Sequence, residues 1–148
     1  AALFHRLNDI FIVFNRELAR YGGHLRQYII DDKGIVLIAT FGLRGATFPN
    51  MISCHGLPCT VAIHNALQVE LDVESQIGGT FGTAYCGVVG GVCRHEYSVL
   101  GPCVNLSARL MSSAYNPGII VDNNVRLKAS TEFSFNALEP VKAKGYVV

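Results

Sequence analysis

The stretch that decides the fold lies between Arg94 and Gly118, and it reads Arg-His-Glu-Tyr-Ser-Val-Leu-Gly-Pro-Cys-Val-Asn-Leu-Ser-Ala-Arg-Leu-Met-Ser-Ser-Ala-Tyr-Asn-Pro-Gly. Its first part predicts a short strand over residues 97–100, which the Gly-Pro pair at 101–102 ends with a turn. A helix is then expected over about 104–115. Asn-Pro-Gly at 116–118 stops this helix, because proline cannot continue it and glycine suits the exit turn.

This expected helix has two different faces. Asn105 and Arg109 are four residues apart and share a face, with an amide one turn from a guanidinium. The pair is either part of a solvated surface or an anion site, since a guanidinium offers a planar fork of donors to a phosphate. The other face is apolar and is expected to meet a core through Leu106, Leu110, Met111 and Ala114.

The residues around this helix resemble a known signature. The run from Tyr97 to Met111 is similar to the strand-Gly-x-x-Val-Asn-Leu-Ala-x-Arg signature of class III nucleotide cyclases. The segment from Ile77 to Gly90 resembles the glycine-rich segment of the same family. With Arg-His-Glu-Tyr at 94–97, the chain most resembles the second catalytic domain of soluble, bicarbonate-responsive adenylyl cyclases. The strong match covers 77–118, and weaker similarity extends over most of the chain.

The resemblance implies an α+β fold, a ferredoxin-like α/β sandwich with helices packed on a mostly antiparallel sheet. It implies that Asn105 orients the ribose and that Arg109 stabilises charge on the α-phosphate while the 3′-oxygen attacks. Ser98 stands where the family reads the purine, and a hydroxyl there favours adenine over guanine. The implied reaction is the conversion of ATP to cyclic AMP and pyrophosphate.

Two further positions follow from the resemblance. Counted without gaps, Gln27 and Asp31 stand where the family has a base-contacting lysine and, four residues later, a magnesium-binding aspartate. The aspartate matches and the lysine does not. Gln27 could still hydrogen-bond a base edge, and Asp31 serves equally well as a turn residue. The implied cofactor is Mg²⁺ or Mn²⁺, held largely by a partner domain because one carboxylate cannot make a two-metal site.

Hydrophobic spacing predicts the other elements. An amphipathic helix runs from about Leu3 to Leu18 and ends at Gly22-Gly23. Six glycines between 78 and 91 mark tight turns or close backbone approach. The remaining expected elements are a strand hairpin of 25–30 and 35–41, a helix over about 58–71, strand-like alternation at 73–77, a strand at 119–121, a turn or cap at 122–124, and a closing hairpin of 133–138 with 141–144.

Composition places the chain among globular proteins. It has 148 residues, half of them hydrophobic and 16% charged, with a net charge of +1 that gives no general case for binding nucleic acid. No apolar run reaches the length of a spanning helix. The five cysteines indicate reduced thiols and a cytoplasmic location. Cys54, His55, Cys59 and His64 have no standard zinc spacing, so ordinary thiols are favoured over a metal-binding module.

These observations predict one cyclase homology domain over residues 1–148, with an active site shared between this domain and a second, paired one. The family has a strand before the first helix that carries the first metal-binding aspartate, so the domain is expected to be truncated at its N-terminus. Two alternatives stay open. One is a regulatory pseudo-cyclase that binds nucleotide weakly, favoured by Gln27, and the other is a guanylyl cyclase, disfavoured by Ser98.

Overall fold

The computed structural model describes residues 2–31, 34–42, 50–82, 84–90 and 95–138, and for 2, 31, 86–90 and 95–99 it describes the backbone only. The chain divides into two compact units, 1–75 and 76–148. The division falls between Ser75 and Gln76, where the sequence has no linker composition. Within the described ranges no helix is both long and apolar enough to cross a membrane.

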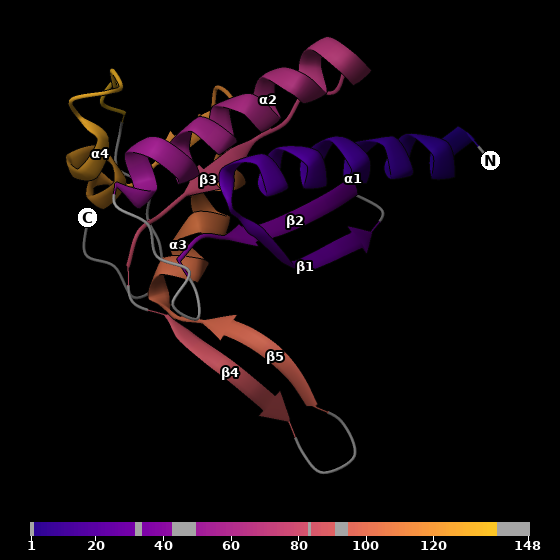
Figure 1. Ribbon diagram of the computed structural model, residues 1–148, viewed down its shortest axis with the longest axis horizontal. Helices are drawn as coiled ribbons and strands as arrows, with labels where there is room; N and C mark the ends of the chain where they lie inside the picture. The colour runs from indigo at the N-terminus through magenta and orange to yellow at the C-terminus, as the bar shows by residue number, and fades with distance from the viewer. Residues whose placement is uncertain (1, 32–33, 43–49, 83, 91–94, 139–148) are drawn as a thin grey trace. The chain divides into compact units, whose positions relative to one another are not determined.

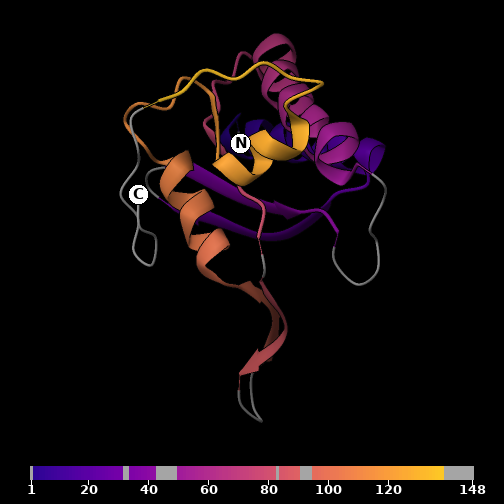
Figure 2. The same cartoon turned by 90° about the vertical axis from the view of Figure 1, so that its left-hand side faces the viewer.

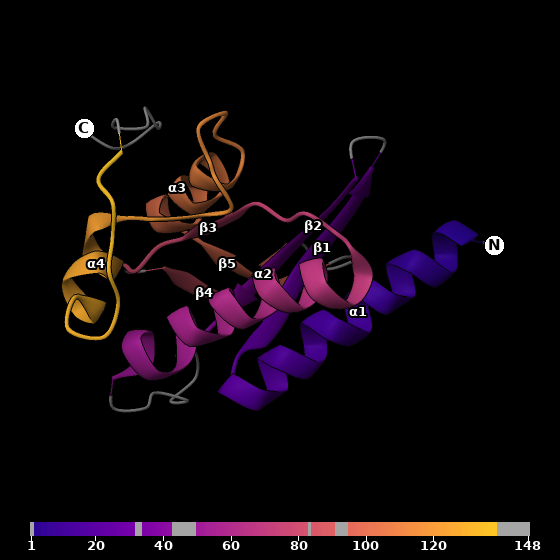
Figure 3. The ribbon, with the colours of Figure 1, turned by 90° about the horizontal axis from the view of Figure 1, so that it is seen from above.

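The first unit places two helices beside a two-stranded sheet. Its elements are α1 (Ala2–Tyr21), β1 (His24–Asp31), β2 (Gly34–Thr40), the π-helical turn η1 (Met51–Gly56) and α2 (Leu57–Leu71). The strands pair antiparallel, and their register shifts between Leu25 and Gln27. α1 and α2 lie side by side and run in opposite directions on one face of this sheet (Figures 1 and 3).

Apolar side chains at helical spacing hold this unit together. One stripe of α1 is buried because it meets α2 and the sheet, as expected for an amphipathic helix. Phe11 of α1 meets Tyr28 of β1 edge to face, with ring centroids 5.3 Å apart. The buried apolar residues of the two helices are Ile10, Val13, Phe14, Leu18, Leu57, Cys59, Ile63 and Leu67.

The second unit contains two strand pairs and two helices. Its elements are β3 (Ile77–Gly79), β4 (Tyr85–Gly90), β5 (His95–Leu100), α3 (Pro102–Met111), β6 (Ile119–Val121) and α4 (Asn123–Ala129). β3 pairs with β6 in parallel, and β4 pairs with β5 antiparallel. The β4–β5 ribbon is twisted and extends away from α3, which follows directly after β5 (Figure 2).

Helix α3 packs closely on β3. A Cβ built on Gly78 would lie 2.2 Å from the carbonyl oxygen of Ser107 and 2.6 Å from the backbone nitrogen of Met111, so only glycine fits there. Leu106 and Leu110 of α3 are buried with Ile120 of β6 in one cluster. Close backbone approach, expected for this glycine-rich segment, is confirmed at Gly78.

Several expected boundaries were wrong. α3 ends at Met111 rather than near Tyr115, and Ala114 is exposed. Residues 73–76 form no strand, because the left-handed Asp72 ends α2 and an irregular connection follows. The expected strand at 133–138 is irregular, and its expected partner at 141–144 lies outside the described residues. The spacing of hydrophobic residues does not predict η1 or α4, because both are too short to show a clear helical period.

The expected hairpin of β1 and β2, the helix α2 and the strand β6 are confirmed. The sheet differs from expectation, because the described strands form three separate pairs, two antiparallel and one parallel, rather than one mostly antiparallel sheet.

Candidate active site

The predicted transition-state pair lies on the solvent face of α3. Asn105 and Arg109 are both exposed, while Cys103, Leu106 and Leu110 on the opposite face are buried. Within the described part of the chain, neither the Asn105 amide nor the Arg109 guanidinium has a hydrogen bond or ion pair. Helical spacing therefore gives the amide and the guanidinium one common exposed face, where no described residue uses their donors.

Ser98, the expected purine-reading residue, is part of β5 and pairs with Gly87 of β4. Its side chain lies outside the described residues. The strand ends at Leu100, and Gly101 then forms the N-cap of α3. The predicted order of strand, glycine turn and helix is thus confirmed, and it places Ser98 and Asn105 in consecutive elements.

Gln27 and Asp31 belong to the first unit, on β1. Gln27 pairs with Ile38 of β2, and its side chain is exposed, without a hydrogen bond in the described part of the chain. Because Tyr28 contacts Phe11 of α1, its neighbour Gln27 lies on the opposite face of the strand, away from α1. Asp31 is the last residue of β1 and pairs with Gly34, and its side chain is outside the described residues.

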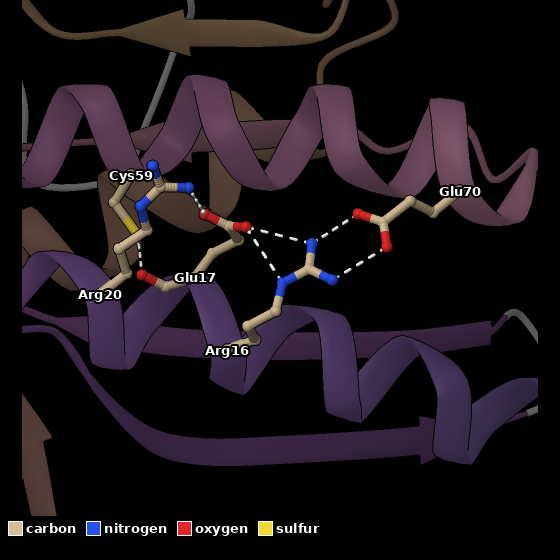
Figure 4. A network of polar contacts seen from close by, with 5 residues as sticks. All are labelled: Arg16, Glu17, Arg20, Cys59 and Glu70. Atoms are coloured by element: carbon tan, nitrogen blue, oxygen red, sulfur yellow. Dashed lines mark hydrogen bonds and ion pairs between the residues drawn. The ribbon is translucent and has the colours of Figure 1, made fainter.

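An ion-pair network between α1 and α2 was not found by sequence reasoning. Arg16 donates to Glu17 and to Glu70, with Nη1 2.8 Å from Oε1 of Glu70 (Figure 4). These bonds raise the pKa of the Arg16 guanidinium, and the bond to Glu70 contributes most to this shift. The bond from Arg16 also lowers the pKa of the Glu70 carboxyl. Glu17 is buried; its Oε2 has no hydrogen bond within the described residues, and Arg20 Nη1 lies 3.9 Å away. Arg16 therefore connects the two helices.

The cysteine and histidine cluster makes no metal site. Cys54 is exposed, whereas Cys59 is buried and donates its thiol hydrogen to the carbonyl oxygen of Glu17 at 3.5 Å. Burial raises the pKa of Cys59 to about 12, so this thiol stays protonated at neutral pH. His55 and His64 contact the Tyr21 carbonyl and the Ser75 hydroxyl instead. Among the described residues no group of three metal-binding side chains exists.

Two polar residues of the second unit hold elements together. Asn116 is buried, and its amide donates to the carbonyl oxygens of Leu110 and Met111 at the end of α3. Asp122 caps α4 by accepting from the backbone N–H of Val125, which confirms the cap expected at 122–124. Desolvation raises the pKa of the Asp122 carboxyl, and backbone hydrogen bonds oppose this shift in part.

Comparison with known sequences agrees with the motifs on β5 and α3. The model of the adenylate and guanylate cyclase catalytic domain family matches residues 1–147. Adenylate cyclase type 10 from Homo sapiens is 33% identical over 125 residues, which is 84% of this chain. Adenylate cyclase type 10 from Mus musculus is 35% identical over 111 residues, which is 74% of this chain. The chain spans only 8% of the length of the human relative.

Comparison with solved structures shows the same fold. The adenylyl cyclase CyaB from P. aeruginosa is similar with a TM-score of 0.80 and 18% identity, over 98% of this chain and 77% of that one. The guanylate cyclase domain of RhGC from Catenaria anguillulae, solved with GTP, is similar with a TM-score of 0.77 and 16% identity, over 97% of this chain and 78% of that one. The expected α+β cyclase fold is therefore confirmed.

Proposed function

Because the chain belongs to the adenylate and guanylate cyclase catalytic domain family, we propose that it converts ATP to cyclic AMP and pyrophosphate. The reaction takes place at a site that this domain shares with a second cyclase domain. The whole described chain acts as one cyclase homology domain, located in the cytoplasm, where its cysteines stay reduced.

The observation that carries this proposal is the pair of free donors on α3. Asn105 and Arg109 are exposed on one face and have no partner among the described residues. In-line phosphoryl transfer spreads negative charge over the equatorial oxygens of the transferred group, and a planar guanidinium stabilises such charge. Arg109 supplies that stabilisation, and Asn105 orients the ribose so that its 3′-oxygen can attack the α-phosphate.

Pairing with a second domain is supported by exposed apolar side chains on β1. Tyr28 is 59% exposed, and Ile29 and Ile30 are each 52% exposed, so apolar surface remains on both faces of this strand. Burial of such apolar surface against a second domain would stabilise a pair. The partner then completes the shared site.

Cyclase catalytic domains use divalent metal ions. The described residues do not fit a complete metal site, since Asp31 is a single carboxylate and no cluster of three metal-binding side chains exists among them. We therefore assign most of the Mg²⁺ or Mn²⁺ ligands to the partner domain, with Asp31 as a candidate ligand from this chain.

ATP is the proposed substrate rather than GTP. The sequence relatives above 30% identity are adenylate cyclases, and a serine stands at the purine-reading position 98. The Gln27 amide is exposed on β1 and can both donate to and accept from a base edge. It cannot supply the charge of the lysine that the family has at this position, so a catalytically weak regulatory domain is the second candidate function.

Cyclic AMP formation by the purified chain with Mg²⁺ and ATP tests the proposal. The chain is assayed alone and with a cyclase domain that supplies two metal-binding carboxylates but has had its own transition-state arginine removed. Only Arg109 of this chain can then complete the site. We expect almost no product from either domain alone and clear activity from the mixture. A mixture that binds ATP but forms no cyclic AMP would favour the regulatory function.

A further inference from the structure

We propose that Gly78 and Asn116 are positioning residues that hold the last turn of α3 against β3 and thereby fix the location of Arg109. This inference rests on the proposed function, because it gives the position of Arg109 a role in the reaction. Neither residue contacts the predicted site on the solvent face of α3, so both act through the helix.

Gly78 determines how closely α3 approaches the strand. The backbone of α3 occupies the space where a side chain at position 78 would lie, with the Ser107 carbonyl oxygen 2.2 Å and the Met111 nitrogen 2.6 Å from a built Cβ. Both are backbone atoms, so they cannot move aside as the end of a flexible side chain could. Any larger residue at position 78 must displace the helix itself.

Asn116 ties the end of the helix to the same strand. Its Nδ2 lies 3.0 Å from the Leu110 carbonyl oxygen, 3.3 Å from that of Met111 and 3.3 Å from that of Ile77. Its Oδ1 accepts from the backbone N–H of Gly118 at 2.8 Å. One buried amide thus satisfies two carbonyls at the helix end and joins them to β3 and to the chain entering β6.

The position of Arg109 depends on this turn more than that of Asn105 does. Arg109 immediately precedes Leu110 and Met111, whose carbonyls the Asn116 amide binds, whereas Asn105 lies in the first turn of α3. A misplacement of about 1 Å in a catalytic group can reduce a rate by about 10²-fold. The sequence indicates only that the helix stops near Asn116. The hydrogen bonds from the Asn116 amide to α3 and to β3 form only in the folded chain.

Asn116→Asp removes the two amide donors, keeps the shape, and places a carboxylate against three carbonyl oxygens. Hydrogen exchange of the 148-residue chain is the first measurement. We expect faster exchange of the Leu110, Met111 and Ser112 amides, with little change in α4. Asn136→Asp is the matched control, because Asn136 is exposed and has no hydrogen bond in the described part of the chain. Unchanged exchange at the end of α3 would overturn the proposal.

Gly78→Ala is the second variant. It tests the contact between β3 and the last turn of α3 by a change in the strand. Gly79→Ala is its control, since a Cβ there meets, among the described residues, only the Val121 side chain, at 3.2 Å. If Asn116→Asp does not fold, Asn116→Ser keeps a donor without adding charge and replaces it in both measurements.

Activity of the mixed pair is the second measurement. We expect Asn116→Asp and Gly78→Ala to lower kcat at least about tenfold, with KM for ATP changed less than about twofold, because the loss falls on a transition-state contact. In an Arg109→Ala background the same changes should have almost no further effect on kcat. Equal losses in both backgrounds would indicate a general structural defect and overturn the positioning role.

The two measurements separate this inference from the proposed function. A native pair without cyclase activity would count against the proposed function, and with it against any role of this contact in the reaction. Hydrogen exchange would still show whether Asn116 and Gly78 hold the helix end. Normal activity of both variants in an active pair would overturn the inference and leave the proposed function standing.

Discussion

Arg16 in the first unit and Arg109 in the second are both arginines on helices, yet their surroundings differ. Arg16 bonds to Glu17 and Glu70 and joins α1 to α2. Arg109 is exposed on α3 and has no ion pair among the described residues. An arginine whose donors are used by carboxylates of its own unit stabilises that unit, whereas one with free donors is available to a ligand. Substituting each arginine in turn tests this contrast.

The largest expected effect is that of Arg109→Ala on catalysis. Loss of a transition-state contact should lower kcat of the mixed pair by about 10²-fold or more, about 3 kcal/mol, with the circular dichroism spectrum unchanged. Arg6→Ala is the matched control, because Arg6 is exposed on α1 and has no ion pair in the described residues. Equal activity of the Arg109→Ala and Arg6→Ala variants would mean that Arg109 is an ordinary surface residue with no role in the reaction. Asn105→Ala should behave as Arg109→Ala does.

The preference for ATP over GTP should change by a smaller factor than kcat does in Arg109→Ala. Replacing Ser98 with alanine should reduce the preference for ATP over GTP, because one good hydrogen bond to a base edge is worth about 1–3 kcal/mol. Competition kinetics with both nucleotides would measure the ratio. Gln27→Ala in the same assay shows whether the first unit also contributes to base recognition. A preference for GTP by the unmodified pair would contradict the proposed substrate.

Arg16→Ala should affect stability and leave catalysis unchanged. The variant loses both bonds to Glu70, and among the described residues it leaves the buried Glu17 carboxylate with only Arg20, 3.9 Å away. We expect a lower Tm than that of Arg6→Ala, measured by calorimetry, because exposed ion pairs contribute little but an underpaired buried carboxylate is destabilising. Loss of activity at temperatures where the variant is folded would remove the distinction between the two arginines.

The smallest expected effects concern pH, and they have opposite signs in the two units. The pKa of Glu70 is lowered by Arg16, so its stabilising contribution is present above the ordinary value of 4.5 and is lost as pH falls through the folded-state pKa. The pKa of Asp122 is raised by desolvation above 3.8. The folded state therefore retains its proton more strongly, and stability falls as pH rises from 3.8 through the folded-state pKa.

Urea unfolding between about pH 3 and pH 6 measures both trends. Glu70→Gln should reduce the loss of stability on the acid side, and Asp122→Asn should remove the opposite trend while keeping the Oδ1 acceptor of the cap. Glu74→Gln, at an exposed position without an ion pair in the described chain, is the control. Identical pH profiles for all three variants would contradict these assignments.

Local patterns predicted the elements that depend on local forces. The apolar stripe of α1, the hairpin of β1 and β2, and the strand, turn and helix of β5 and α3 follow from spacing and from glycine and proline at their ends. The same pattern placed Asn105 and Arg109 on one exposed face, and that placement is confirmed. The family motif added their proposed roles, which geometry alone does not supply.

The sequence by itself thus determined the family, most helices and strands, and the residues proposed for catalysis. Tertiary structure decided which polar groups are used within the fold. Arg16 and Glu70 are 54 residues apart, and the Asn116 amide reaches Ile77 across 39 residues. Helical and strand periods describe only neighbours along the chain, whereas the end of α3, the close contact at Gly78 and the pairing of each arginine depend on segments that meet only after folding.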